Sequence, residues 1–206
     1  MLVRAAALLL IASNALAGIA YRFDGTATGS GRVIAEGPKM RVEFLRGERV
    51  FSVMISTDGG KTLTTLDPAT KTFNVTNVAG LFEAVSLTNA KATARDLGDG
   101  GTLEGYPTRK WVVDGSYDLR VGDTPVHFTM HSESWRTERI TEDAQLKGSS
   151  VAEAMMPANV KGFPLKEVMT IASKGGTVKS TTEVHDVRRV STTPAMFAVP
   201  AGYKRK

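Results

Sequence analysis

The stretch KMRVEFLRGERVFSVMISTDGGKTLTTLDPATKTFNV, residues 39–75, decides the fold. Between Met40 and Phe44 apolar and charged side chains alternate with a period of two, which is typical of a strand with one buried face. Gly47 breaks this run, and the Asp-Gly-Gly-Lys segment 58–61 supplies residues that accept positive φ, as a tight hairpin requires. The pattern predicts strands at residues 40–44, 50–55, 62–66 and 72–75. We expect these strands to form an antiparallel meander. It is too long to close on itself, so we expect it to form a curved sheet.

The rest of the chain also has mostly the periodicity of strands. Residues 19–37 alternate loosely through Gly25, Gly29 and Gly31, which predicts one long first strand, bent or bulged at the glycines and ended by Pro38. Further extended segments are expected at residues 88–97, 103–114, 117–121, 126–136, 163–173 and 177–190, with turns at 98–101, 122–124 and 174–176. The sequence therefore predicts a mainly β protein.

Two segments interrupt the strands with helical features. Apolar residues recur at helical spacing around Phe82, which predicts a short amphipathic helix over residues 79–87. Later, Ser150 and Glu153 fit a capping box, so we expect a helical turn or two through Met155 before Pro157 stops it. These two short helices are candidates for lids over a curled sheet.

The N-terminus has the features of a cleaved secretory signal. Arg4 provides a positive charge, residues 5–12 are apolar, and Ala15-Leu16-Ala17 is a small-residue cleavage site before Gly18. A membrane anchor is the alternative, but the apolar run is shorter than the roughly 20 residues that span a bilayer. We expect residues 1–17 to be a signal peptide and residues 18–206 to form a single soluble domain, exported to the bacterial periplasm or secreted.

Composition narrows the class of protein further. The chain has no cysteine, so an exported form has no disulfide bonds and must be stabilised by its hydrophobic core. Lipid cannot be attached beside the cleavage site either, because Ile19 stands where the lipid-bearing cysteine would be. The formal net charge is +5, with basic residues spread along the chain. The apolar tail 197–203 is expected to lie along the sheet edge, and the basic end 204–206 to be solvated. Weak contact with an anionic membrane surface is the minor alternative, and we expect no nucleic-acid binding, since no aromatic-basic motif accompanies the charge.

Several strand and turn motifs together resemble a bacterial family of exported proteins of unknown function. They are MRVEF at 40–44, MISTDGGKT at 54–62, LDP at 66–68, KTF at 71–73, Gly105-Tyr106-Pro107 before Trp111, GFPL at 162–165, and the ending from 184–187 to 196–204. That family is similar in turn to the LolA/LolB/LppX-like carriers of lipoproteins and lipids. The resemblance implies an unclosed antiparallel half-barrel, its hollow covered by helical lids. Ile19 departs from the pattern of the family, because several relatives have at this position a cysteine through which they are anchored to the membrane.

Catalytic and metal motifs are weak in this chain. A Walker A loop would need a glycine five residues before Gly60, where Ile55 stands, so residues 58–61 are better explained as a hairpin turn. His127 and His131 share a strand face but lie ~13 Å apart at ~3.3 Å per residue, too far to hold one ion, and Glu133 adds only part of a site. No Gly-x-Ser-x-Gly elbow occurs. We therefore expect that the protein is not an enzyme and that it binds no cofactor and no metal ion.

Large apolar side chains are the more informative group. If the sheet is a curved half-barrel, some of its inward residues line a cavity for an apolar ligand. The candidates are Met40, Val42, Phe44, Phe82, Trp111, Phe128, Met130, Trp135 and Met155. The alternative is that all of them form an ordinary filled core.

Two functions follow from these alternatives. The first is a non-enzymatic periplasmic protein that binds or carries an apolar ligand, such as a lipid or lipoprotein acyl chain, by shielding it from water. The second is a structural or protein-interaction module of the cell envelope with a filled core and no ligand. The volume of the cavity distinguishes them.

Overall fold

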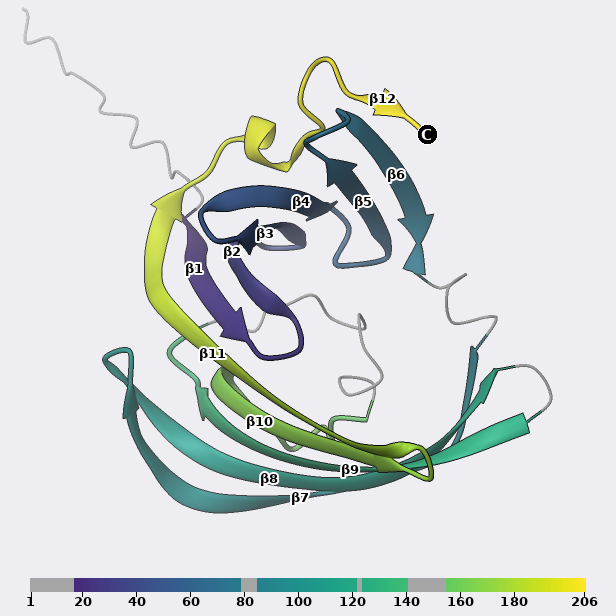
Figure 1. Ribbon diagram of the computed structural model, residues 1–206. Coiled ribbons are helices and arrows are strands. Elements are labelled where there is room, and N and C mark those ends of the chain that lie inside the picture. The colour runs from purple at the N-terminus through teal and green to yellow at the C-terminus, as the bar shows by residue number, and fades with distance from the viewer. Residues whose placement is uncertain (1–16, 79–84, 122–123, 141–154) are drawn as a thin grey trace, which may run out of the picture.

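The computed structural model describes residues 17–78, 85–121, 124–140 and 155–206 (Figure 1). In these residues, strands form one sheet in the order β12-β6-β5-β4-β3-β2-β1-β11-β10-β9-β8-β7. The strands are β1 Ala17–Gly25, β2 Gly29–Glu36, β3 Lys39–Arg46, β4 Arg49–Ser56, β5 Thr62–Asp67, β6 Thr72–Asn77, β7 Val85–Leu103, β8 Tyr106–Val121, β9 Thr124–Thr137, β10 Phe163–Ser173, β11 Gly176–Ser191 and β12 Lys204–Arg205. All neighbours are antiparallel except β12, which runs parallel to β6.

Chain connectivity forces this sheet to curl. Strands β6 and β7 are ten places apart in the sheet, which is roughly 48 Å in a flat sheet at ~4.8 Å per strand. The chain from Asn77 to Val85 can span at most roughly 29 Å, even when fully extended. The two ends of the sheet must therefore approach each other. Figure 1 shows the result, with strands β1–β6 curled into a lobe above the curved trough of the long strands β7–β11.

Strand β11 joins the two halves of the sheet. Its C-terminal part pairs with β1 of the lobe, and its N-terminal part pairs with β10 of the trough. Within the β1–β11 pairing the register shifts at a bulge, where Asp186 takes a φ of 55°. The bulge is held by the hairpin between β7 and β8, since the backbone N–H of Asp186 donates to Glu104 Oε2 at 3.0 Å. The fold is thus mainly β, with a single unclosed sheet.

The meander predicted from residues 39–75 is confirmed. Strands β3 to β6 contain all four predicted segments, and the register of each pair is antiparallel. The turn between β4 and β5 is the predicted one, because Gly59 and Gly60 have φ values of 74° and 91°. Residues 58–61 therefore lie in a strand-turn-strand context and not before a helix, unlike a phosphate-binding loop.

Asp58 holds this turn together. Its Oδ1 accepts hydrogen bonds from the backbone N–H of Thr62 and from the hydroxyl of Ser56, both at 3.0 Å. The bond from Thr62 is the main reason that the pKa of the Asp58 carboxyl lies below its ordinary value. A carboxylate with a lowered pKa stabilises the fold above its unfolded pKa, and this contribution is lost as the pH falls through the folded pKa.

We therefore expect Asp58→Asn to lower the free energy of unfolding by about 1 kcal/mol at neutral pH. This value is the difference between the usual contribution of a hydrogen bond to a charged group and that of a hydrogen bond to a neutral group. The difference between parent and variant should shrink as the pH falls below about 4. Urea denaturation at a series of pH values measures it. A difference that stays constant down to pH of about 3 would contradict this account of the turn.

Three expectations for strands and turns are wrong. Residues 19–37 form not one bent strand but the hairpin β1–β2, with its turn at 26–28 tied to β11 by a hydrogen bond of 2.9 Å from the backbone N–H of Thr26 to Thr181 O. Residues 98–101 are not a hairpin turn but two bulges inside β7, in which Asp96 and Asp99 each accept a hydrogen bond from the glycine two residues later. The hairpin turn lies at residues 104–105 instead, where both residues have positive φ.

The third wrong expectation concerns the first of the two predicted helices, over residues 79–87. Residues 85–87, expected to end a helix, begin strand β7 and pair with β8. Residues 79–84 of that expected helix, the turn residues 122–123 and the capping-box segment from Ser150 to Glu153 lie outside the described residues. In the described part, no helix is long and apolar enough to cross a membrane.

The C-terminal tail covers a face of the sheet as well as its edge. The short helix η2, Pro194–Phe197, and the residues after it pack on a core cluster formed by Val53, Ile55 and Leu66 of β4 and β5. Phe197 is itself buried there. Strand β12 then fixes the basic end to β6 through backbone hydrogen bonds, with its side chains exposed. The lobe therefore has a buried apolar layer on both of its faces.

Candidate functional site

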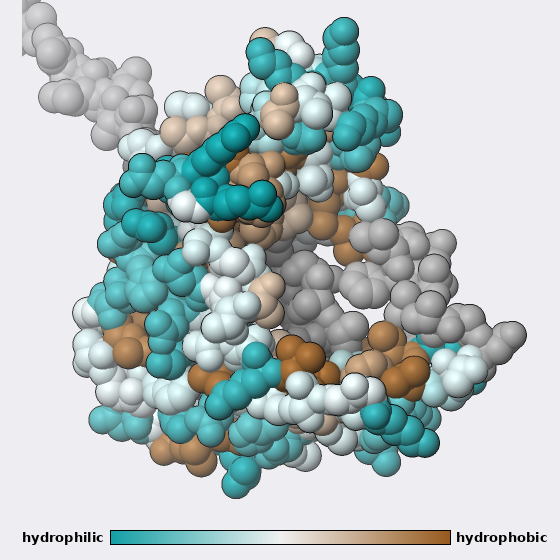
Figure 2. Space-filling view, in the orientation of Figure 1, coloured by the Kyte–Doolittle hydropathy of each residue, from teal (hydrophilic) through white to brown (hydrophobic). Residues whose placement is uncertain are grey.

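An apolar hollow of about 330 Å³ lies on the inner face of the lobe, next to β10 and β11. Met40, Val42 and Phe44 point into it from alternate positions of β3, as the period of a strand requires. The lining residues are Tyr21, Phe23, Thr28, Val33, Met40, Val42, Phe44, Met54, Phe163, Pro164, Glu167, Thr182 and Val184. In the space-filling view, hydrophobic side chains gather where the lobe faces the long strands (Figure 2).

Aromatic rings form part of the wall of this hollow. The ring of Phe23 meets that of Phe44 edge-on, with centroids 6.1 Å apart, and Tyr21 meets Phe163 edge-on at 5.2 Å. Burial raises the pKa of the Tyr21 hydroxyl well above its ordinary value. Phe44 is only half-buried, so its ring forms part of the wall and is not enclosed in a packed core.

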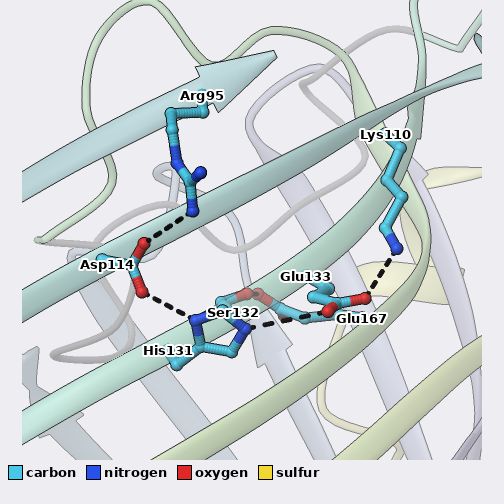
Figure 3. A network of polar contacts seen from close by, with 7 residues as sticks. All are labelled: Arg95, Lys110, Asp114, His131, Ser132, Glu133 and Glu167. Carbon is cyan, nitrogen blue, oxygen red and sulfur yellow. Dashed lines mark hydrogen bonds and ion pairs between the residues drawn. The ribbon is translucent and has the colours of Figure 1, made fainter. Parts of the chain in front are cut away.

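A carboxylate also lines the hollow. Glu167 of β10 lines it and accepts a hydrogen bond of 2.8 Å from the hydroxyl of Ser132 on β9 (Figure 3). Ser134, two residues further along the same face, is 1% exposed, and its hydroxyl has no hydrogen-bond partner among the described residues. Ligand sites of this kind have a mainly apolar lining with a few polar groups that orient the ligand, and Glu167 is such a group here, whereas Ser132 and Ser134 do not line the hollow.

The other candidates on the inner face belong to a second cluster, on the concave side of the trough. Trp111, Met130 and Met155 are buried at 8%, 4% and 5% exposure, and they pack with Val113, Tyr117 and Val160. Phe128 stacks on Tyr117, with ring centroids 5.3 Å apart. None of these residues lines the 330 Å³ hollow. They form a packed core, to which Met155 and Val160 contribute from the chain segment before β10.

Trp135 lies on the opposite face of the sheet from Trp111. In β9 the buried residues Met130, Ser132 and Ser134 alternate with Trp135, which is only half-buried. Its ring is covered by two lysine side chains, with Lys110 Nζ 4.7 Å and Lys166 Nζ 5.7 Å from the ring centroid. It is therefore held by cation–π contacts outside the hollow. Phe82 lies outside the described residues.

The histidines of β9 join a polar network on this outer face. His131 Nδ1 lies 2.7 Å from Asp114 Oδ1, and Arg95 contacts the other oxygen of the same carboxyl at 3.4 Å (Figure 3). Its bond to His131 is the main reason that the pKa of Asp114 is lowered. His127 makes the same kind of contact with Asp118, at 2.7 Å. Within the described residues, no cluster of three acidic, histidine or cysteine side chains could hold a metal ion.

Sequence reasoning missed most of the hollow's lining. Only Met40, Val42 and Phe44 were identified, whereas Phe163 and Val184 come from strands more than a hundred residues later. Met54 carried a usable signal, because it lies opposite Val42 in the predicted β3–β4 hairpin. No local pattern marks Glu167, since its place in the lining depends on which strands pair.

The comparisons with known proteins place the chain in a family. A model for DUF4412, a domain of unknown function, matches residues 26–203. A solved structure described as an uncharacterized conserved protein from Thermus thermophilus is similar, with a TM-score of 0.48, 15% identity, and coverage of 93% of this chain and 90% of that chain. No curated protein matches. Because the family model spans most of the sheet, from the first hairpin turn to the end of the tail, this chain belongs to the DUF4412 family.

Proposed function

We propose that this protein is a non-enzymatic, exported carrier that binds an apolar ligand, such as an acyl chain, in the hollow of the lobe. The observation that carries the proposal is the hollow itself, about 330 Å³ in volume and lined mainly by apolar side chains. That volume lies at the lower end of the range for small-molecule sites, roughly 300–1,000 Å³. A carrier function would be similar to that of the LolA-like proteins that the sequence resembles. Residues 1–17, which have the features of a signal peptide, support a periplasmic location.

The hydrophobic effect would drive binding, and its magnitude limits which chains can bind. Each buried methylene contributes about 0.8 kcal/mol, whereas association costs at least about 4 kcal/mol in lost freedom. A chain must therefore bury more than about five methylenes before binding becomes favourable. Glu167 would receive a polar hydroxyl or amino end, while the chain lies against Met40, Val42 and Phe44.

Competition by fatty alcohols of increasing length against a fluorescently labelled fatty alcohol, the probe, tests this. Affinity should rise about fourfold per added methylene until the hollow is full, because about 0.8 kcal/mol corresponds to that factor. Phe44→Asp should weaken probe binding at least about tenfold, since it removes apolar contact and places a charge where the chain lies. The matched control is Val178→Asp, which adds the same charge at an apolar residue that is 65% exposed.

A different set of results would reject the carrier. If the purified parent ignores the probe at every chain length, or if Phe44→Asp and Val178→Asp bind it equally, the hollow is not a ligand site. The structural module then becomes the better proposal. The packed cluster around Trp111 and Met155 favours that second function, because its side chains pack on one another without a ligand.

A further inference from the structure

A second cavity, a groove of about 610 Å³, lies on the outer face of the same strands. It is lined mostly by residues that do not line the hollow, on β1, β2, β3 and β11, and by Met196 of η2. Its lining is Ala20, Tyr21, Arg22, Arg32, Val33, Ile34, Arg41, Glu43, Asp186, Arg188, Val190, Ser191 and Met196. Four of these residues are arginines and two are acidic, so the groove has an excess of two positive charges.

Strand register shows how the arginines surround the floor of the groove. One row across the sheet runs Arg188–Ala20–Ile34–Arg41, with each residue directly opposite the next. The two guanidinium-bearing residues at its ends are roughly 14 Å apart, or three strand spacings, with the apolar Ala20 and Ile34 between them. The neighbouring row runs Arg22–Arg32–Glu43. The groove therefore has an apolar floor with positive charge on its rims.

The carboxylates of the groove neutralise only two of these arginines. Arg41 is paired with Glu43 at 2.9 Å and also donates to the backbone oxygen of Met196 at 3.4 Å. Arg22 lies 3.9 Å from Asp186. In the described part of the chain, the side chains of Arg32 and Arg188 make no hydrogen bond or ion pair with another residue. Moreover, Arg32 stands directly opposite Arg22, and like charges at such cross-strand positions are destabilising.

We propose that this groove binds the phosphate group of an amphiphilic phosphate monoester. A monoester carries nearly two negative charges and several acceptor oxygens, which match the two uncompensated guanidiniums and relieve the repulsion between Arg22 and Arg32. The apolar floor and Met196 contact the organic part of the molecule. Two sources share this chemistry, a free phosphorylated compound and a lipid headgroup at a membrane surface. The groove lies on the face opposite the apolar hollow, so this proposal does not depend on the carrier function.

The test uses the whole protein and two probes, phenyl phosphate in solution and phosphatidylcholine vesicles that contain phosphatidic acid. The double variant Arg32→Gln/Arg188→Gln removes the two unpaired charges of the groove. Its matched control is Arg49→Gln/Arg189→Gln, which removes two exposed arginines that do not line the groove. Each lost guanidinium should weaken binding about tenfold, so the groove variant should bind about a hundredfold more weakly and the control should bind like the parent.

Every outcome decides for or against the groove. Saturable binding of phenyl phosphate that the groove variant alone loses supports the proposal and identifies a free molecule as the source. Binding to the phosphatidic acid vesicles only, again lost in that variant alone, supports it with a lipid headgroup. If the parent binds neither probe, if the groove variant binds like the parent, or if both double variants lose binding equally, the proposal is overturned. Thermal melting checks that each variant folds. If the groove double variant does not fold, Arg188→Gln alone replaces it, and this single variant should bind about tenfold more weakly than the parent.

Discussion

Phe163→Ala is expected to lower the free energy of unfolding by about 3–5 kcal/mol, the usual cost of removing a buried phenylalanine ring. Phe163 is 1% exposed, and it starts strand β10 at the junction of the lobe and the trough. Its ring packs edge-on against Tyr21 of the first strand, and it belongs to the cluster that includes Val33 and Met40. The substitution therefore removes contacts from both halves of the protein at once.

Urea denaturation measures this difference, and Phe51→Ala is the matched control. Phe51 has the same side chain but is 45% exposed, so its removal should cost less than about 1 kcal/mol. A Phe163→Ala variant that unfolds at the same urea concentration as Phe51→Ala would show that the junction is not a stabilising core. The slope of the transition should stay unchanged, because the surface exposed on unfolding is nearly the same.

Gly162→Ala is expected to cost about 3 kcal/mol or more. Gly162 has a φ of +85°, which costs a residue with a side chain roughly 1–2 kcal/mol. A Cβ added there would also lie 2.7 Å from the backbone oxygen of Thr137, so the chain would have to shift. The carbonyl of Gly162 accepts a hydrogen bond of 2.8 Å from Nε of the buried Arg136, which a shift would strain.

Gly37→Ala separates the two causes. Gly37 also has a positive φ, +54°, but a Cβ there would meet nothing within 4 Å. We expect it to cost only the roughly 1–2 kcal/mol of the backbone conformation. Equal losses of stability in the two variants, measured by chemical denaturation, would mean that the close approach of Gly162 to Thr137 contributes nothing.

Part of the fold could be predicted because its cause is local. Alternation over residues 40–44 specifies a strand with two unlike faces, and the glycines at 59 and 60 accept the positive φ that the β4–β5 turn needs. The hairpin of β10 and β11 followed from the same kind of signal. By contrast, glycine also permits bulges, so the pattern at residues 98–101 could not tell a hairpin turn from bulges within β7.

The site was less predictable, because a period of two separates the faces of a strand without saying which one is inside. Trp111 and Trp135 both sit in alternating segments, yet one is buried in the inner cluster and the other lies under two lysines on the outer face. Pairing and bulges decide this, and both depend on strands far away in the sequence. The same holds for the groove, in which Arg188 of β11 is opposite Ala20 of β1.

The sequence by itself determined that this chain forms antiparallel strands with apolar inner positions, since local alternation and turn residues are sufficient for that. Only the tertiary structure decided where the sheet encloses space. The short link from β6 to β7 makes the sheet curl, and β11 joins its two halves. The hollow and the groove then lie on opposite faces of the same strands, β1 to β3 and β11, because successive side chains on a strand point to opposite sides.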